Sequence, residues 1–174
     1  MSKKSVTSSR VPAIVLLVSA TLLGGAYAFQ YIGGLAPCKL CLYQRVPHAA
    51  VIVITILSLL TIAFRGERSL FARHLVQFAG LVLLSGAAIA AYHAGIEYHW
   101  WAGPDTCSGT IGQNAGSIED LLNQLEKAPI VRCDEVAWSL LGISMAGYNF
   151  LISALLGLIA LFPGLWPLLP GVRR

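Results

Sequence analysis

The segment VPHAAVIVITILSLLTIAF, residues 46–64, contains no aspartate, glutamate, lysine or arginine. A helix needs about 20 predominantly apolar residues to cross the hydrocarbon core of a bilayer, so this segment is long enough to span a membrane. Residues 11–32 and 75–92 are also free of charge, and a charge-free stretch from 136 to 172 has room for another span at 143–162. We therefore predict an all-α membrane protein built as a bundle of four transmembrane helices.

The composition points the same way. Of the 174 residues, 56% are hydrophobic and 11% are charged, whereas soluble domains average roughly 25% charged residues. A soluble protein of this size with four apolar helices would have too little polar sequence to cover them. The length corresponds to one domain, so we treat residues 1–174 as a single membrane domain.

The positive charges indicate how the chain is oriented. Most lysines and arginines gather in the N-terminal tail, the 65–74 loop and the C-terminus: Lys3, Lys4, Arg10, Arg65, Arg68, Arg73, Arg173 and Arg174. By the positive-inside rule, we expect these three regions to be cytoplasmic. The loops at 33–45 and 93–142 then face the opposite side of the membrane. No basic, aromatic-rich surface indicates a nucleic-acid partner.

The first apolar segment also has features of a signal peptide. Basic residues precede it, and Ala26-Tyr27-Ala28 near its end matches the small-residue cleavage pattern. However, the segment is longer than a usual signal core of roughly 7–15 residues. Cleavage would also remove one helix from an even-numbered bundle, so we expect residues 11–32 to be retained as a span.

All four cysteines lie in the two loops predicted to face away from the cytoplasm: Cys38 and Cys41 in the first, Cys107 and Cys133 in the second. Thiols in an oxidising compartment are expected to pair. Four cysteines allow three connectivities, and the sequence alone does not select one. The C-x-x-C spacing favours pairing of Cys38 with Cys41, because such a pair can close over a single turn.

The C-x-x-C motif has the surroundings of a redox centre. It follows Pro37 and directly precedes the second span, where the unpaired backbone N–H groups of a helix N-terminus stabilise a thiolate. Lys39 and Arg45 add positive charge nearby. A thiolate is the form that attacks disulfides and donates electrons, so we interpret Cys38 and Cys41 as redox-active.

Other chemistries fit the cysteines less well. A zinc site would need a second close pair, and its ligands would have to resist oxidation. Covalent c-type haem requires C-x-x-C-H, but residue 42 is leucine. A b-type haem between His48 and His93 would leave the cysteines without a function. Purely structural disulfides remain an alternative, although a bridge across so short a loop removes little chain entropy.

Two further residues are candidates for binding an electron acceptor. Arg45 lies one helical turn beyond Cys41 if the helix is continuous there, and its guanidinium could stabilise a developing anion. Pro47 leaves the continuity open, because it suits either a helix start or a kink. His93, at the end of the third span, could hydrogen-bond a carbonyl or pass a proton. Neither is a metal ligand in this interpretation.

The second outer loop contains a predicted helix of its own. Ser117 can cap a short amphipathic helix that continues to Ala128, with Asp120 three residues after the cap. Ile118, Leu121, Leu122 and Leu125 fall on one face at helical spacing. This face either lies on the membrane surface or packs over the top of the bundle, and the sequence does not separate the two.

Residues 37–45, PCKLCLYQR, resemble the signature of the disulfide bond formation protein B (DsbB) family of bacterial inner-membrane thiol oxidases. Further motifs follow in the same order: Tyr92-His93, Trp100-Trp101-Ala102-Gly103-Pro104, Cys107, Arg132-Cys133-Asp134, Trp138 and Leu141-Gly142-Ile143-Ser144-Met145. The resemblance covers nearly the whole chain. The combined set of motifs is specific, whereas any single one would not be.

The resemblance implies a reaction sequence. A reduced periplasmic DsbA-like protein attacks Cys107 of a Cys107–Cys133 disulfide, and the freed Cys133 attacks Cys38. Cys41 is then released as a thiolate that passes electrons to a membrane quinone, either ubiquinone or menaquinone, through a covalent or charge-transfer adduct. Arg45 stabilises the negative charge, and the Cys38–Cys41 disulfide forms again.

The resemblance also implies cofactor contacts and a place in the cell. Arg45 and His93 would bind the quinone, and the protein would lie in the bacterial inner membrane with both termini in the cytoplasm. A DsbA-like donor has a potential near −120 mV, against about −270 mV for thioredoxin. A thioredoxin-like acceptor would therefore lie about 150 mV uphill, whereas a quinone dissolved in the bilayer can accept the electrons.

Two alternatives of other kinds stay open at this point. A quinone reductase of the vitamin K epoxide reductase type uses a similar bundle and C-x-x-C, but there the loop cysteines precede the motif, whereas here they follow it. A membrane protein with structural disulfides would show no quinone-dependent thiol oxidation.

Overall fold

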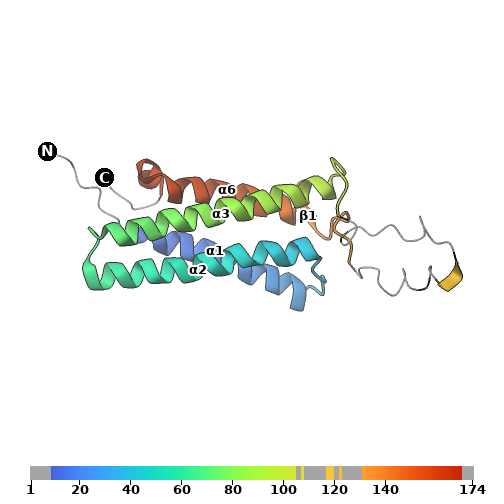
Figure 1. The fold of residues 1–174 in the computed structure, drawn as a ribbon, viewed down its shortest axis with the longest axis horizontal. Helices are drawn as coiled ribbons and strands as arrows, with labels where there is room; N and C mark the ends of the chain where they lie inside the picture. The colour runs from blue at the N-terminus through green and yellow to red at the C-terminus, as the bar shows by residue number, and fades with distance from the viewer. Residues whose placement is uncertain (1–8, 105–106, 108–116, 120–121, 123–130, 170–174) are drawn as a thin grey trace.

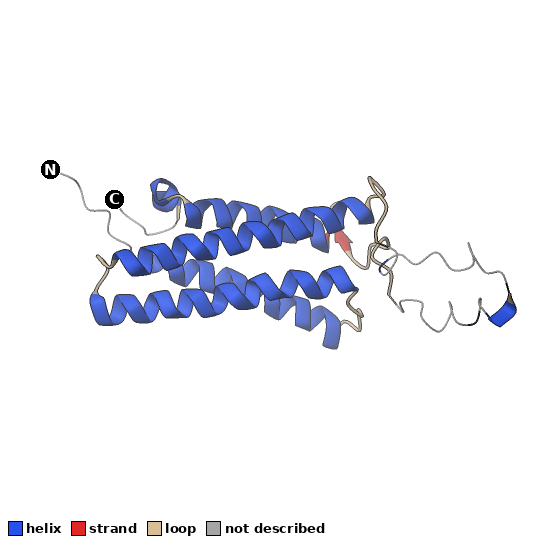
Figure 2. Ribbon diagram, viewed as in Figure 1, coloured by secondary structure: helices blue, strands red, loops and turns tan. Residues whose placement is uncertain are grey.

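The computed structural model describes residues 9–104, 107, 117–119, 122 and 131–169. Four helices lie side by side in a bundle (Figure 1): α1 (Arg10–Tyr31), α2 (Lys39–Arg65), α3 (Leu70–Glu97) and α6 (Met145–Leu161). A short antiparallel hairpin, β1 (Ser139–Leu140) and β2 (Ile143–Ser144), leads into α6, and a 3-10 helix, η1 (Pro163–Leu168), follows it. The rest of the bundle is helical (Figure 2), which confirms the predicted all-α membrane fold.

The outside of the bundle is apolar. Large side chains such as Leu17, Phe64 and Leu155 are 64–86% exposed. In water such a surface would drive association, whereas in lipid it is the expected exterior of a helix whose backbone is satisfied internally. Helices α1, α2 and α3 are long and apolar enough to cross a membrane, and α6 is a shorter apolar helix. The fourth span therefore stays a prediction.

Helix α2 begins earlier than the predicted span. It starts at Lys39 and continues without interruption through Pro47, so the region predicted as the 33–45 loop contains the first turns of this helix. Pro47 is therefore an interior residue of α2. Gly86 on α3 provides the space for its ring, because a Cβ atom there would lie 2.9 Å from Pro47 Cβ. Helix α3 likewise extends to Glu97, which makes His93 helical.

Close packing of α3 against α6 depends on Gly80. A Cβ atom at this position would lie 2.7 Å from the backbone nitrogen of Leu161 and 2.8 Å from the carbonyl oxygen of Gly157. Real Cβ atoms do not approach backbone that closely, so the two helices can meet here only because Gly80 has no side chain. This contact fixes α6 beside α3.

The two ends of the bundle differ in what they contain. At one end, the backbone nitrogen of Ser9 donates to Glu67 in the α2–α3 turn, and Trp166 of η1 packs with Val11 in the apolar core. At the other end lie the start of α2, the end of α3 and the β hairpin (Figure 1). We call this second end the cysteine end, because Cys38, Cys41, Cys107 and Cys133 all lie there.

The predicted amphipathic helix from Ser117 to Ala128 lies for the most part outside the described residues. Ser117, Ile118, Glu119 and Leu122 are described and exposed. Whether the apolar face of this segment rests on the membrane therefore stays a prediction.

Candidate active site

The C-x-x-C motif forms the first turn of α2. Cys38 is the N-cap residue, and its Sγ accepts a hydrogen bond of 3.3 Å from the backbone nitrogen of Cys41. The two sulfur atoms lie 3.1 Å apart, and both residues are free thiols. This is the helix N-terminus at which the sequence placed the motif, and it brings the sulfurs within reach of each other.

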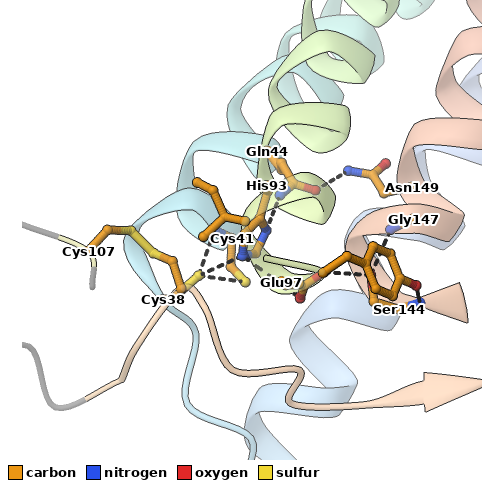
Figure 3. A network of polar contacts seen from close by, with 12 residues as sticks. Cys38, Cys41, Gln44, His93, Glu97, Cys107, Ser144, Gly147 and Asn149 are labelled. Atoms are coloured by element: carbon orange, nitrogen blue, oxygen red, sulfur yellow. Dashed lines mark hydrogen bonds and ion pairs between the residues drawn. A yellow bond between two sulfur atoms is a disulfide. The ribbon is translucent and has the colours of Figure 1, made fainter. Parts of the chain in front are cut away.

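His93 of α3 completes the surroundings of Cys38. Its side chain is buried, and its Nε2 lies 3.5 Å from Cys38 Sγ (Figure 3). The hydrogen bonds from Cys41 and from His93 lower the pKa of Cys38 to about 4, although burial acts in the opposite direction. Cys38 is therefore a thiolate at neutral pH when the pair is reduced.

The expected cations do not produce this shift. Lys39 is exposed to solvent. The Arg45 guanidinium turns toward α1, where it donates to Gln30 Oε1 at 2.5 Å and lies 4.7 Å from the centre of the Tyr27 ring. The prediction that Lys39 and Arg45 stabilise the thiolate is thus revised: Cys41 and His93 do so, because their donors face Cys38 directly.

The other two cysteines form a disulfide that packs against the motif. Cys107 and Cys133 are bonded, with Cα atoms 5.3 Å apart, and each is at most 2% exposed. They belong to one apolar cluster with Cys38, Leu40 and Ile96. Figure 3 shows the disulfide beside Cys38. Both cysteine pairs therefore lie in one cluster, although they come from different loops.

A cavity of about 380 Å³ lies next to Cys41. It lies among α1, α2, α3, α6 and the segment before β1, and most of its lining is apolar: Leu22, Ala26, Phe29, Trp138, Met145 and Ile152. Cys41, Arg45 and His93 reach it as well, whereas Cys38 is not part of its wall. The predicted acceptor-binding residues Arg45 and His93 thus share one cavity with Cys41.

Sequence reasoning missed a chain of two amides behind His93, the buried Gln44 and the half-buried Asn149. Gln44 Nε2 lies 2.8 Å from His93 Nδ1, and Asn149 Nδ2 donates to Gln44 Oε1 at 2.7 Å. His48 and Ser153 contact Asn149 Oδ1 in turn. The available signal was the polar residue type itself, because amides and histidines inside apolar helices are expensive unless they are paired or functional.

A buried carboxylate lies on the other side of His93. Glu97 Oε1 is 3.9 Å from His93 Nε2, and Glu97 Oε2 accepts a hydrogen bond of 2.5 Å from Ser144 Oγ. Ser144 is the N-cap of α6, and its Oγ also accepts from the backbone nitrogen of Gly147. This pair ties the start of α6 to the end of α3 beside the site (Figure 3).

Cys107 and Cys133 are bonded to each other, so the four cysteines cannot jointly bind a metal ion while this disulfide is intact. The sulfurs of Cys38 and Cys41 and a ring nitrogen of His93 lie within 4.8 Å of one another and could hold a metal ion while the pair is reduced. A dithiol outside the cytoplasm is instead expected to oxidise.

The profile of the family described as "Disulfide bond formation protein DsbB" matches residues 8–163. The chain belongs to the DsbB family. It is 31% identical over 166 residues to a disulfide bond formation protein B of Verminephrobacter eiseniae, covering 89% of this chain and 85% of the relative. A second such protein, from Polaromonas sp., is 30% identical, covering 87% and 88%.

An uncharacterised protein of Rickettsia prowazekii, RP370, is also 30% identical, with 86% of each chain covered. No solved structure matches the chain. DsbB membership confirms the resemblance seen in the motifs. It shows that the chain is a membrane oxidoreductase of disulfide formation.

Proposed function

We propose that this DsbB protein is a protein-thiol:quinone oxidoreductase that reoxidises a periplasmic DsbA-like dithiol protein and passes the electrons to ubiquinone or menaquinone. One observation carries the proposal. Cys41 packs against the cluster that contains the Cys107–Cys133 disulfide, and it also lines the apolar cavity. The C-x-x-C pair therefore lies between the loop disulfide, which shares a cluster with Cys38, and a cavity lined by Cys41 that can hold an electron acceptor.

The cavity fits a quinone head group. Phe29 and Trp138 present a tilted aromatic pair, with ring centroids 5.3 Å apart, along its wall. Arg45 Nε is buried and has no hydrogen-bond partner in the described part of the chain, so a donor is free for an oxygen atom of the ligand. A quinone would accept two electrons and two protons there, and we propose that Arg45 and His93 bind it.

The loop disulfide is the proposed entry point for electrons. A thiolate of the partner attacks Cys107 Sγ, a mixed disulfide forms, and Cys133 leaves as a thiolate. Cys107 is 2% exposed, so the partner can reach it only after the outer loop moves away from the bundle. The second partner thiol then resolves the mixed disulfide, which releases an oxidised partner.

Transfer to the C-x-x-C motif needs no long movement of the sulfurs. When Cys38 and Cys41 form a disulfide, Cys133 can attack Cys38, because both belong to one cluster. The Cys38–Cys41 bond breaks, and Cys41 leaves with the electron pair at the cavity wall. Cys107 then attacks Cys133, which re-forms the Cys107–Cys133 disulfide and releases Cys38 as a thiolate. The Cys38–Cys41 disulfide closes again as two electrons pass to the acceptor, which takes up two protons.

We also propose that the cysteine end faces the periplasm of a bacterial inner membrane, that α6 with η1 is the fourth span, and that both termini are cytoplasmic. The arginines of the α2–α3 turn and its neighbours, Arg65, Arg68 and Arg73, lie at the opposite end. Impermeant thiol reagents applied to intact cells should modify Cys41 after reduction. Modification only after lysis would contradict this orientation.

The proposed reaction can be tested with purified protein in detergent, a reduced DsbA-like protein and a short-chain quinone, by following the loss of quinone absorbance. Cys41→Ser should abolish turnover with any thiol donor. Cys107→Ser should abolish turnover with the protein donor but keep it with a small dithiol that reduces Cys38–Cys41 directly. Equal loss of both activities in Cys107→Ser, or no quinone reduction by the unmodified chain, would contradict the proposal.

A further inference from the structure

His48 of α2 lines the cavity deeper in the bundle than Cys41 and carries an unused polar atom. The residue is 5% exposed, and its Nε2 lies 2.9 Å from Asn149 Oδ1. Its Nδ1 is buried without a hydrogen-bond partner in the part of the chain that the structure describes. A buried polar atom left unpaired carries an uncompensated desolvation penalty, so a ligand that pairs with Nδ1 gains affinity.

The neighbouring amides decide what kind of partner Nδ1 needs. Asn149 Nδ2 donates to Gln44 Oε1, so Asn149 presents its Oδ1 atom to His48. Ser153 Oγ donates to that same oxygen at 3.0 Å. A carbonyl oxygen can only accept, and the proton between the two residues must therefore belong to His48 Nε2. In a neutral imidazole the other nitrogen then carries a lone pair and no proton.

The opposite orientation of the amide is less favourable. With Asn149 reversed, His48 Nε2 would become the acceptor and Nδ1 would carry the proton. That N–H would be buried without an acceptor among the described residues. Orphaned N–H groups are rarer in proteins than unpaired acceptors. No salt bridge joins a carboxylate to the ring in the described part of the chain, and burial of His48 disfavours the charged imidazolium.

The oxidised and reduced forms of the acceptor present different hydrogen-bonding groups to the unprotonated Nδ1 of His48. A quinone presents carbonyl oxygens, which are acceptors and cannot pair with Nδ1. The reduced quinol presents hydroxyl groups, which donate. We propose that His48, oriented by Asn149, accepts a hydrogen bond from a quinol hydroxyl and so makes this site bind quinol more tightly than quinone; this rests on the proposed quinone reaction.

Preferential binding of quinol would favour the forward reaction. A site that stabilises the reduced form raises the potential of the bound couple, because the affinity ratio and the potential are linked. One hydrogen bond contributes about 0.5–1.5 kcal/mol net, which corresponds to a preference of up to about tenfold. For two electrons, a tenfold preference raises the potential by about 30 mV.

The test measures binding, so that catalysis does not interfere. Purified Cys41→Ser protein is titrated with a short-chain ubiquinone and, under reducing conditions without oxygen, with its quinol. One readout is tryptophan fluorescence, to which Trp138 on the cavity wall contributes, and the other is calorimetry. We expect the quinol to bind up to about tenfold more tightly. Adding His48→Phe should remove this preference by weakening quinol binding, with the Kd for quinone within about twofold of its starting value.

Two further variants complete the experiment. Asn149→Leu keeps the imidazole of His48 but removes the group that fixes the position of its proton, so the preference for quinol should fall without vanishing. If His48→Phe does not fold, this variant tests the proposal in its place. His74→Phe, at an exposed position of α3, is the matched control and should change neither affinity. Equal binding of both redox forms, or an unchanged ratio in His48→Phe, would overturn this inference while the oxidoreductase proposal stands. Absence of quinone-dependent thiol oxidation in the unmodified chain would instead remove the proposed function itself.

Discussion

Nε2 of His93 lies 3.5 Å from Sγ of Cys38, although the two residues are 55 positions apart in the sequence. The contact joins the end of α3 to the start of α2 and places an imidazole donor against the sulfur that caps the helix. The reactivity of the C-x-x-C motif therefore depends on a residue outside it, and this dependence can be measured.

Replacing His93 with leucine should raise the pKa of Cys38. A hydrogen bond to a charged group contributes about 1.5–3 kcal/mol, and about 1.4 kcal/mol corresponds to one pH unit. The rate of Cys38 alkylation against pH, measured in a Cys107→Ser/Cys133→Ser background, should therefore shift upward by about one to two units. Because the hydrogen bond from Cys41 remains, the pKa of Cys38 should still lie below that of an ordinary cysteine thiol. His74→Leu serves as the control, and an unshifted profile would show that His93 only fills space.

The potential of the Cys38–Cys41 pair should depend weakly on pH. Below pH 4 both thiols are protonated, so reduction takes up two protons, and the midpoint should fall by about 59 mV per pH unit. Above the pKa of Cys38, about 4, the reduced pair keeps one proton while Cys41 stays protonated. The slope should then be about 30 mV per unit. The Cys38 thiolate, which stabilises the reduced pair, exists only above this pKa and is lost as the pH falls through it. Redox titrations at several pH values between 5 and 8 would check this, and a slope near 59 mV throughout would contradict it.

Removing the charge of Arg45 should weaken quinone use without affecting thiol exchange. Arg45→Met keeps much of the side-chain volume but removes the only cation whose side chain lines the cavity among the described residues. We expect the KM for a short-chain quinone to rise about tenfold or more, consistent with the loss of a hydrogen bond to a charged group. Exchange between the loop disulfide and a reduced partner, followed by gel shift, should be unchanged. Lys39→Met is the matched control, since Lys39 is a neighbouring but exposed cation.

Ser144→Ala should destabilise the bundle. The substitution removes the N-cap of α6, worth about 0.5–2 kcal/mol, and takes away the donor to the buried Glu97 carboxylate. Together we expect a loss of about 2–3 kcal/mol in the free energy of unfolding. Titration of the protein in mixed micelles with a denaturing detergent, followed by circular dichroism, gives this quantity. Ser144→Thr should recover most of it, whereas Ser139→Ala, at an exposed hairpin position, should have little effect. A change below about 0.5 kcal/mol in Ser144→Ala would mean that solvent replaces both contacts.

Some of the fold could be read from the sequence because lipid imposes a simple rule. A segment such as residues 46–64 contains no aspartate, glutamate, lysine or arginine. In a bilayer, such a segment satisfies its own backbone hydrogen bonds by forming a helix. The predicted positions of the helix ends were less accurate. Residues 39–45 carry Lys39, Gln44 and Arg45, so they look like a loop, yet they are the first turns of α2. They are helical because Cys38 caps the helix and Gln44 is paired inside the bundle.

The sequence by itself determined the membrane class, the family and the four cysteines that carry the proposed chemistry, because apolar length and local motifs are written along the chain. Only the tertiary structure decided that His93 contacts Cys38 and that Arg45 turns toward Gln30. It also decided that Nδ1 of His48 has no hydrogen-bond partner among the residues that the structure describes. The physical reason is that a hydrogen bond requires atoms within about 3.5 Å. Which helix faces bring such atoms together depends on the packing of all four helices at once, and glycines such as Gly80 set how closely they approach.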